Sequence, residues 1–336
     1  MTIPTVSVVV PTYNRAASLG RLLRCIARQS YQHFECLVID DGSNDQTQAQ
    51  YEAIWQGLDP RFRLYLKSKD DRRFGPARSR NRGIELAQGA FIAFCDDDDL
   101  WIRNDHLSIA VRLLTQYQAD FFFANMQSSA DGVTVNPNLY SPSDIILCRN
   151  PLPGAADVFD VSRKSVSRFL ESRNIHSDTL VVARQLFEKA GLYWEDISEA
   201  EDYEMVFRLA DQAQRMIYRS GVVGYLDVSS HASVSRQWPV RERVLLDMMA
   251  CLRAEILMTD SRMRRSARTS RAWRILELAN LEAQQGRGRT ALSLEGLALR
   301  LSAEPLRILA RSFVKPVFAI ASKVRTHFHR HSPNSR

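Results

Sequence analysis

The stretch VSVVVPTYNR, residues 6–15, joins a β-branched run to a group of polar residues. An apolar run of this length, broken only by Ser7, predicts a strand that is buried on both faces. Asn14 can cap the helix that follows, in which apolar residues recur at helical spacing from Leu19 to Ile26. The stretch therefore predicts a βα unit, the element from which parallel sheets are built.

The same alternation of strand and helix continues along the first 125 residues. Strands are predicted at 34–39, 62–66, 91–94 and 121–123, with helices at 77–88 and 103–117. Residues 127–160 are rich in Ser, Pro, Asn and Asp, and they predict a long loop or an insertion. Helices at 184–190 and 201–213, a strand at 222–228 and helices after Pro239 follow. We predict an α/β fold with a mainly parallel sheet flanked by helices and a helical C-terminal extension.

Polar residues follow three of the predicted strands at the point where each strand ends. They are Thr12, Tyr13 and Asn14 after the first strand, Asp40 and Asp41 after the second, and Asp96 to Asp99 after the fourth. In open sheets of this kind, ligands bind outside the carboxyl ends of the strands. The sequence therefore predicts a ligand site at this edge of the sheet.

Composition excludes several classes of protein. With 336 residues, 45% of them hydrophobic and 25% charged, the chain is not disordered throughout. Its apolar stretches fall short of the ~18 residues of a membrane-spanning helix, and its first residues lack the pattern of a secretory signal. The five cysteines are widely spaced without a CxxC pair, which argues against a disulfide framework or a zinc site. We expect a protein of the reducing cytoplasm.

The net charge of +7 comes from the C-terminal part of the chain. Residues 239–336 hold 19 basic and 8 acidic residues, whereas residues 1–238 hold 26 and 30. This split predicts a second segment that faces something anionic, without indicating a nucleic acid. Apolar and basic residues alternate from Leu306 to Lys323, which fits either a basic amphipathic helix on an anionic membrane or a helical cap with a solvated basic face.

The negative charge of the acidic run Asp96 to Asp99 must be compensated wherever the run is partly buried. Adjacent like charges repel each other, and burial raises that cost unless a cation or hydrogen bonds offset it. Mg²⁺ or Mn²⁺ together with a phosphate-bearing ligand would do so. A solvated acidic turn before the next helix is the other interpretation, and the run alone does not decide between them.

The segments VSVVVPTYNR, LVIDDGSNDQT, ARSRNRGIELAQG and FIAFCDDDDLW occur in an order and spacing that resembles family 2 glycosyltransferases, which have the GT-A fold. The resemblance runs from about residue 5 to 236. It implies a GT-A domain over 1–238, with a Rossmann-like nucleotide-sugar half at 1–126 and an acceptor half at 127–238. A basic helical extension at 239–326 and a disordered tail at 327–336 would follow.

For the donor, the resemblance implies that Pro11, Thr12, Tyr13 and Asn14 contact the nucleotide, with Tyr13 near the base. Asp40, or alternatively Asp41, would accept a hydrogen bond from the imide N–H of uracil, which favours a UDP-sugar. Arg78 and Arg80 would approach the diphosphate, unless they form a solvated helix face.

For the metal, Asp96, Asp97 and Asp98 match the family's D-x-D element, which implies Mn²⁺ or Mg²⁺. Asp98 is the first choice for direct coordination, with Asp96 beside it. The extra charge of Asp97 leaves open which carboxylate faces the ion. His231 resembles a late histidine of the family that completes the metal shell or touches the diphosphate.

For catalysis, the segment ISEAEDYEMVFRLA resembles the acceptor-side helix of the family. It implies Asp202 as general base and Glu201 as an acceptor-binding or orienting residue, although both acids could simply favour a helix N-terminus. The expected reaction is an inverting, non-processive transfer of a sugar from a nucleotide-sugar to a hydroxyl acceptor.

The acceptor would be a glycan, a lipid-linked sugar or a protein, and the setting bacterial surface glycan synthesis at the inner face of the cell membrane. A catalytically silent scaffold that recruits partners through its basic C-terminal helices is the alternative. A nucleotidyltransferase is disfavoured because an early Gly-rich, Lys-bearing phosphate loop is lacking.

Overall fold

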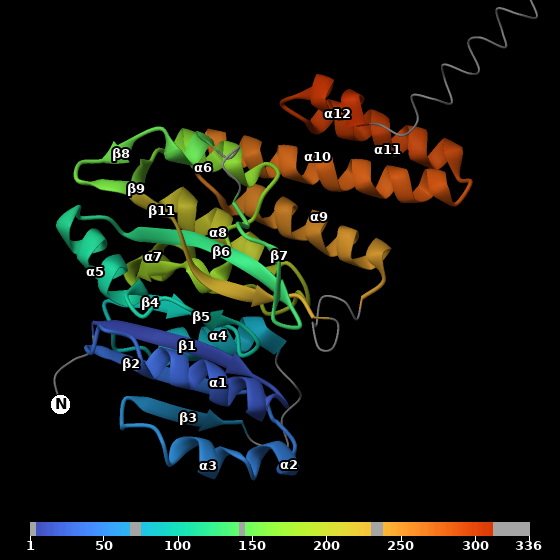
Figure 1. Cartoon of the computed structure of the whole chain (residues 1–336). Helices are drawn as coiled ribbons and strands as arrows, with labels where there is room; N and C mark the ends of the chain where they lie inside the picture. Colours follow the sequence, from blue (N-terminus) through green and yellow to red (C-terminus); the bar gives the residue numbers. More distant parts are fainter. Residues whose placement is uncertain (1–4, 68–74, 141–144, 230–237, 312–336) are drawn as a thin grey trace, which may run out of the picture.

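The computed structural model describes residues 5–67, 75–140, 145–229 and 238–311 (Figure 1). One large mixed sheet forms the centre of the molecule, and the C-terminal helices lie at one end of it. Within the described residues, no helix combines the length and the apolar character that crossing a bilayer requires.

The first part of the sheet is parallel, as the sequence predicted. Its strands β1 (Val6–Thr12), β2 (Phe34–Asp40), β3 (Phe62–Leu66) and β4 (Phe91–Phe94) lie in the order β3-β2-β1-β4. The connecting helices are α1 (Ala16–Ala27), α2 (Asp45–Gln48), α3 (Tyr51–Trp55) and α4 (Gly75–Leu86). All four strands therefore deliver their carboxyl ends to one edge.

The second part of the sheet is mixed. Strand β10 (Val181–Ala183) lies antiparallel between β4 and β6 (Phe121–Ala130), and β11 (Met216–Asp227) then runs parallel to β6. Beyond β11 come β9 (Ala155–Val161) and β8 (Pro151–Leu152), while β5 (Leu100–Trp101) pairs with β11 and β7 (Val133–Asn136) with β6. The predicted α/β fold is confirmed.

Of the two alternatives predicted for residues 127–160, a long loop or an insertion, the long loop was wrong. This region holds the end of β6, the strands β7, β8 and β9, and the 3-10 helix η1 (Ile145–Cys148). All four residues of β7 are exposed, whereas Ser128 and Ser129 near the end of β6 are buried but polar. Neither segment shows the apolar alternation by which a strand is recognised, β7 because it buries none of its residues and the end of β6 because its residues there are polar.

Two hydrophobic cores cover the two faces of the parallel strands. Val9 of β1 packs in one core with Ile84 of α4, whereas Val8 packs in the other with Leu23 of α1. Successive residues of a strand point to opposite faces, so the unbroken apolar run of β1 serves both cores.

The remaining helices are α5 (His106–Gln116), α6 (Arg163–Leu170), η2 (Ser177–Thr179), α7 (Gln185–Ala190), α8 (Glu201–Gln212), α9 (Val240–Leu257), α10 (Ser261–Gln284), α11 (Gly288–Leu301) and α12 (Pro305–Arg311). Cys251 of α9 and Met263 of α10 belong to the same core as Phe207 of α8. Helices α10, α11 and α12 form a further small core of their own. The predicted tail 327–336 and the amphipathic segment beyond Arg311 lie outside the described residues.

Candidate functional site

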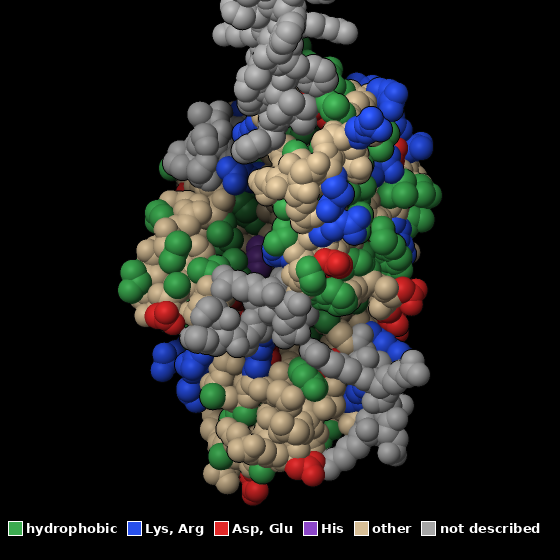
Figure 2. Space-filling model, turned by 90° about the vertical axis from the view of Figure 1, so that its right-hand side faces the viewer, with side chains coloured by type: hydrophobic (Ala, Val, Ile, Leu, Met, Phe, Trp, Pro, Cys, Tyr) green, Lys and Arg blue, Asp and Glu red, His purple; other side chains and the backbone are tan. Residues whose placement is uncertain are grey.

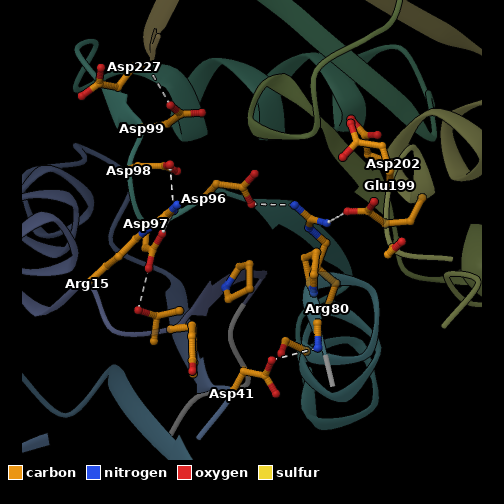
Figure 3. Close-up of a pocket in the computed structure, with 18 of the residues that line it drawn as sticks. Arg15, Asp41, Arg80, Asp96, Asp97, Asp98, Asp99, Glu199, Asp202 and Asp227 are labelled. Atoms are coloured by element: carbon orange, nitrogen blue, oxygen red, sulfur yellow. Dashed lines mark hydrogen bonds and ion pairs between the residues drawn. The ribbon is translucent and has the colours of Figure 1, made fainter. Parts of the chain in front are cut away.

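A cavity of about 470 Å³ opens at the edge where the parallel strands end (Figure 3). It is lined from the β1–α1 connection, the start of α4, the β4–β5 connection, η2, the start of α8 and the end of β11. Of the residues predicted from sequence, it brings together Pro11, Thr12, Tyr13, Asn14, Asp41, Arg80, Asp96, Asp97, Asp98, Glu201 and Asp202.

Arg80 connects two sides of this cavity. Its guanidinium donates hydrogen bonds of 2.7 Å to Asp96 and to Glu201, and its side chain is only 4% exposed. Burial acts against the charged form of Arg80, but the two carboxylates outweigh it and raise the pKa of the guanidinium. Arg80 therefore joins α4 to the end of β4 and to the start of α8.

Arg15 compensates the middle of the acidic run. Its Nη1 atom lies 2.8 Å from Oδ1 of Asp97 and 2.7 Å from Oδ2 of Asp98 (Figure 3). The hydroxyl of Thr12 also donates to Asp97, at 2.7 Å. Burial raises the pKa of Asp97 to about 7, although Arg15 opposes that shift. Asp98 is the more open of the two carboxylates, with 32% of its side chain exposed.

The last acid of the run, Asp99, faces a second carboxylate and a histidine. Ligand atoms of Asp99, His176 and Asp178 all lie within 4.8 Å of one another. Burial, reinforced by the facing Asp178, raises the pKa of Asp99 well above its usual range, and burial raises that of Asp178 to about 6. Two buried carboxylates in contact hold either a shared proton or a cation.

His176 and Asp178 were not predicted from the sequence. Both lie at η2, roughly 80 residues beyond the acidic run, and the main-chain N–H of Asp96 donates to Asp178 at 3.0 Å. The signal was present in the segment HSDTL, which places two ionisable residues directly before an apolar strand.

The acidic residues fit a hard divalent cation. The side chains of Asp96 and Asp98 are 27% and 32% exposed, and both line the cavity. Carboxylate oxygens are the ligands that Mg²⁺ and Mn²⁺ prefer in proteins. His176 lines the same cavity and offers a ring nitrogen, whereas the predicted ligand His231 lies outside the described residues.

The two predicted uracil acceptors differ in where they point. The carboxylate of Asp40 accepts the N–H groups of Gly42 and Ser43, both at 2.8 Å, as well as the hydroxyl of Tyr51. Asp40 is buried and does not line the cavity. Asp41 does line it, and its carboxylate accepts the N–H of Gly75 at 2.8 Å. Of the two predicted acceptors, Asp41 is therefore the one that lines the cavity.

Arg78 also lies away from the cavity. Its side chain is 51% exposed, and its Nε atom is 3.6 Å from a carboxylate oxygen of Glu195. This position on α4 is a solvated helix face, the alternative that the sequence left open.

Glu201 and Asp202 lie in the first turn of α8 and line the cavity, and Figure 3 shows Asp202 on the opposite side from Asp98. Burial raises the pKa of Glu201, partly offset by Arg80. The carboxylate of Asp202 accepts hydrogen bonds from its neighbour's main-chain N–H at 2.7 Å and from Nδ2 of Asn174 at 3.0 Å. Asn174 was not predicted, because its distance in sequence from Asp202 hides this contact.

The family model "Glycosyl transferase family 2" matches residues 7–177, just over half of the chain. The chain therefore belongs to glycosyl transferase family 2, which confirms the family expected from its motifs.

The chain spans about half the length of the curated relatives it matches. It is 31% identical over 147 residues to the putative teichuronic acid biosynthesis glycosyltransferase TuaG of Bacillus subtilis, covering 42% of this chain and 55% of the relative. It is 30% identical over 122 residues to the Escherichia coli β-1,3-glucosyltransferase WfgD, covering 36% and 46%.

Solved structures share the fold over nearly the whole chain. TarS of S. aureus, residues 1–349 in complex with UDP-GlcNAc, aligns with a TM-score of 0.63 at 18% identity, covering 93% of this chain and 84% of TarS. The mannosyltransferase PcManGT of Pyrobaculum calidifontis, in complex with GDP-Man and Mn²⁺, aligns with a TM-score of 0.61 at 20% identity, covering 97% and 83%. These likenesses confirm the predicted GT-A fold.

Proposed function

We propose that this protein transfers a sugar from a UDP-sugar to a hydroxyl acceptor, with inversion at the anomeric carbon. The observation that carries the proposal is the single cavity that both Asp98 and Asp202 line. A donor held at the acidic run would present its sugar toward the first turn of α8, where a proton acceptor is available. Residues 1–238 would form the transferase domain, and the following helices its extension.

The nucleotide would bind along the end of β1. In this proposal Thr12, Tyr13 and Asn14 contact the nucleoside, and Asp41 accepts the imide N–H of uracil. Cytosine has no proton at the corresponding ring nitrogen, so a carboxylate acceptor disfavours it. Guanine also offers ring and amino N–H donors, so the test of the donor compares UDP with GDP directly.

The diphosphate would lie over the acidic run. Asp96 and Asp98 are the residues that would hold Mn²⁺ or Mg²⁺, and His176 offers a nitrogen beside them. When bound, such an ion supplies Lewis-acid stabilisation of the departing diphosphate. Arg80 holds Asp96 and Glu201 at fixed positions, which keeps the two sides of the cavity in register.

Asp202 would act as the general base. Its carboxylate takes the proton of the acceptor hydroxyl while that oxygen attacks the anomeric carbon from the side opposite the diphosphate, which inverts the configuration. Asn174 holds one oxygen of Asp202. Glu201, which is bound to Arg80, would shape the acceptor side.

The acceptor class is suggested by two relatives. The names of WfgD and of a Campylobacter jejuni relative, 35% identical over 96 residues, describe β-1,3-glucosyltransferases acting on sugars linked to diphosphoundecaprenol. We therefore infer a lipid-linked acceptor in bacterial surface glycan synthesis. Figure 2 shows Lys and Arg side chains beside hydrophobic ones at the height of the C-terminal helices, which would suit peripheral contact with the inner face of an anionic membrane.

The decisive test compares Asp202→Asn with Asp196→Asn, an exposed aspartate of the preceding loop. We expect Asp202→Asn to lower UDP release in the presence of an undecaprenyl-diphosphate-sugar acceptor by about 10²- to 10⁴-fold. Calorimetric binding of UDP with Mn²⁺ should persist in both variants. Unchanged turnover in Asp202→Asn would refute the assignment of the base.

The donor is tested by calorimetry with UDP, GDP and CDP. The wild type should prefer UDP, and Asp41→Asn should reduce that preference, because the amide can also present a donor to the base. Equal binding of all three nucleotides by the wild type would contradict the proposed role of Asp41.

A further inference from the structure

The guanidinium of Arg15 lies where a cation would be expected in the acidic run. Arg15 directly precedes α1, its side chain is 21% exposed, and it lines the cavity. A single nitrogen, Nη1, bridges the carboxylates of Asp97 and Asp98 at 2.8 and 2.7 Å. One positive centre between two carboxylates of adjacent residues has the electrostatic role of a bound metal ion.

We propose that Arg15 substitutes for the divalent cation while the site is empty, and that it turns to the diphosphate when cation and nucleotide bind together. This inference rests on the proposed function, because it assumes that Asp98 binds the cation. It adds a role for Arg15 that makes binding of the cation and binding of the nucleotide depend on each other.

Because both are positively charged, Arg15 and the cation compete for the carboxylate of Asp98. A divalent ion at Asp98 would meet the guanidinium within a few ångströms, and two positive centres at that distance repel each other. The departure of Arg15 leaves the neighbouring acids with partners, since Asp96 keeps Arg80 and Asp97 keeps the hydroxyl of Thr12. Arg15 can therefore give way to a cation at Asp98 while Asp96 and Asp97 each keep a hydrogen-bond partner.

The diphosphate gives Arg15 a new partner. It carries at least two negative charges, and a guanidinium can bind phosphate oxygens with two parallel hydrogen bonds. Helix α1 starts at Ala16 with no acidic residue in its first turn and no side-chain cap, so its N-terminal end also favours an anion. Arg15 would thus weaken binding of the cation alone and strengthen binding of the nucleotide once the cation is in place.

The test uses the full chain with Arg15→Gln, which keeps a polar side chain and removes the charge. Mn²⁺ binding is followed by the electron paramagnetic resonance signal of the free ion, first without and then with UDP. We expect Arg15→Gln to bind Mn²⁺ alone about tenfold more tightly, equivalent to about 1.4 kcal/mol. At saturating Mn²⁺ it should bind UDP about tenfold more weakly, while UDP binding without Mn²⁺ stays unchanged, so that the coupling between the two ligands falls about tenfold.

Two further variants serve as controls. Arg103→Gln removes an exposed arginine that pairs with Asp105 outside the cavity, and it should leave both affinities unchanged. Arg15→Lys retains the positive charge and should bind Mn²⁺ alone much as the wild type does. Thermal melting of each variant shows whether it is folded.

The inference is overturned if folded Arg15→Gln binds Mn²⁺ alone no more tightly than the wild type, or binds UDP with unchanged affinity. In either case the proposed function stands, provided that the wild type binds both ligands. A wild type that binds neither Mn²⁺ nor UDP overturns the proposed function, and this inference with it.

Discussion

His106 offers a quantitative test of the packing beneath the acidic run. Its ring lies 4.8 Å from that of Trp101 and 6.0 Å from that of Phe122, measured between centroids. The residue is completely buried, and neither ring nitrogen has a hydrogen-bond partner among the described residues. Burial lowers the pKa of His106 from 6.5 to about 3.

The sign of the pH dependence follows from proton uptake. Below pH 6.5 the imidazole of the unfolded chain takes up a proton, whereas that of the folded protein stays neutral until about pH 3. The unfolded state then binds more protons, so the free energy of unfolding decreases as the pH falls between these two values. At pH 5.0, which is 1.5 units below the unfolded pKa, His106 should cost about 2 kcal/mol relative to pH 7.5.

The perturbation is His106→Phe, which keeps a ring between Trp101 and Phe122 but cannot be protonated. Urea unfolding of both proteins is measured at pH 7.5 and pH 5.0. Any packing cost of the substitution cancels, because each protein is compared with itself at the second pH. The wild type should lose about 2 kcal/mol more than the variant on acidification.

Equal losses in the two proteins would refute the reasoning. A titration of the His106 ring protons by NMR gives a second measurement, and a midpoint near 6.5 in the folded protein would contradict the buried, neutral imidazole. The outcome matters for the site because Trp101, which packs against His106, donates a hydrogen bond to the carbonyl of Asp178 at 2.9 Å. The side chain of Asp178 in turn accepts the main-chain N–H of Asp96 in the acidic run.

Three further substitutions test other parts of the structure. Asn174→Ala should lower kcat by about tenfold with the donor KM unchanged, because Asp202 loses a positioning hydrogen bond of 3.0 Å. An unchanged kcat in steady-state kinetics would contradict this role. Gly83→Ala should cost about 1–3 kcal/mol, since its Cβ would lie 2.2 Å from Cγ1 of Val9; urea unfolding should show partial rescue by Val9→Ala, and its absence would contradict this contact. Arg80→Met should cost about 3–5 kcal/mol, because two carboxylates lose their buried partner; a variant as stable as the wild type in urea would count against that role.

The parallel half of the fold could be predicted because its sequence signals are local. The unbroken apolar run of β1 and the helical spacing in α1 each reflect burial on a known side, and burial is what hydrophobic periodicity reports. Strand β7 carried no such signal, since it is exposed along its whole length. The antiparallel β10 spans only three residues, and it is defined by its partners β4 and β6 rather than by its own composition.

The acids of the site were predictable as types, but their pairings were not. Asp96 to Asp99 stood out as a charged run at a strand end, and Asp202 through its family resemblance. That Arg15 bridges Asp97 and Asp98 depends on a contact across more than 80 residues, which spacing does not encode. The absence of Asp40 from the cavity lining has a local cause, because its carboxylate accepts the main-chain N–H groups of Gly42 and Ser43 in the turn that follows.

The position of β10 has a consequence for synthesis of the chain on the ribosome. This strand comes from residues 181–183, yet it fills the space between β4 and β6, whose sequences end 87 and 51 residues before it. A nascent chain that has emerged only as far as β6 still lacks strand β10, which joins β4 to β6 in the sheet. A fragment that ends after β6 should accordingly complete its sheet only when it is complemented by a fragment that carries β10.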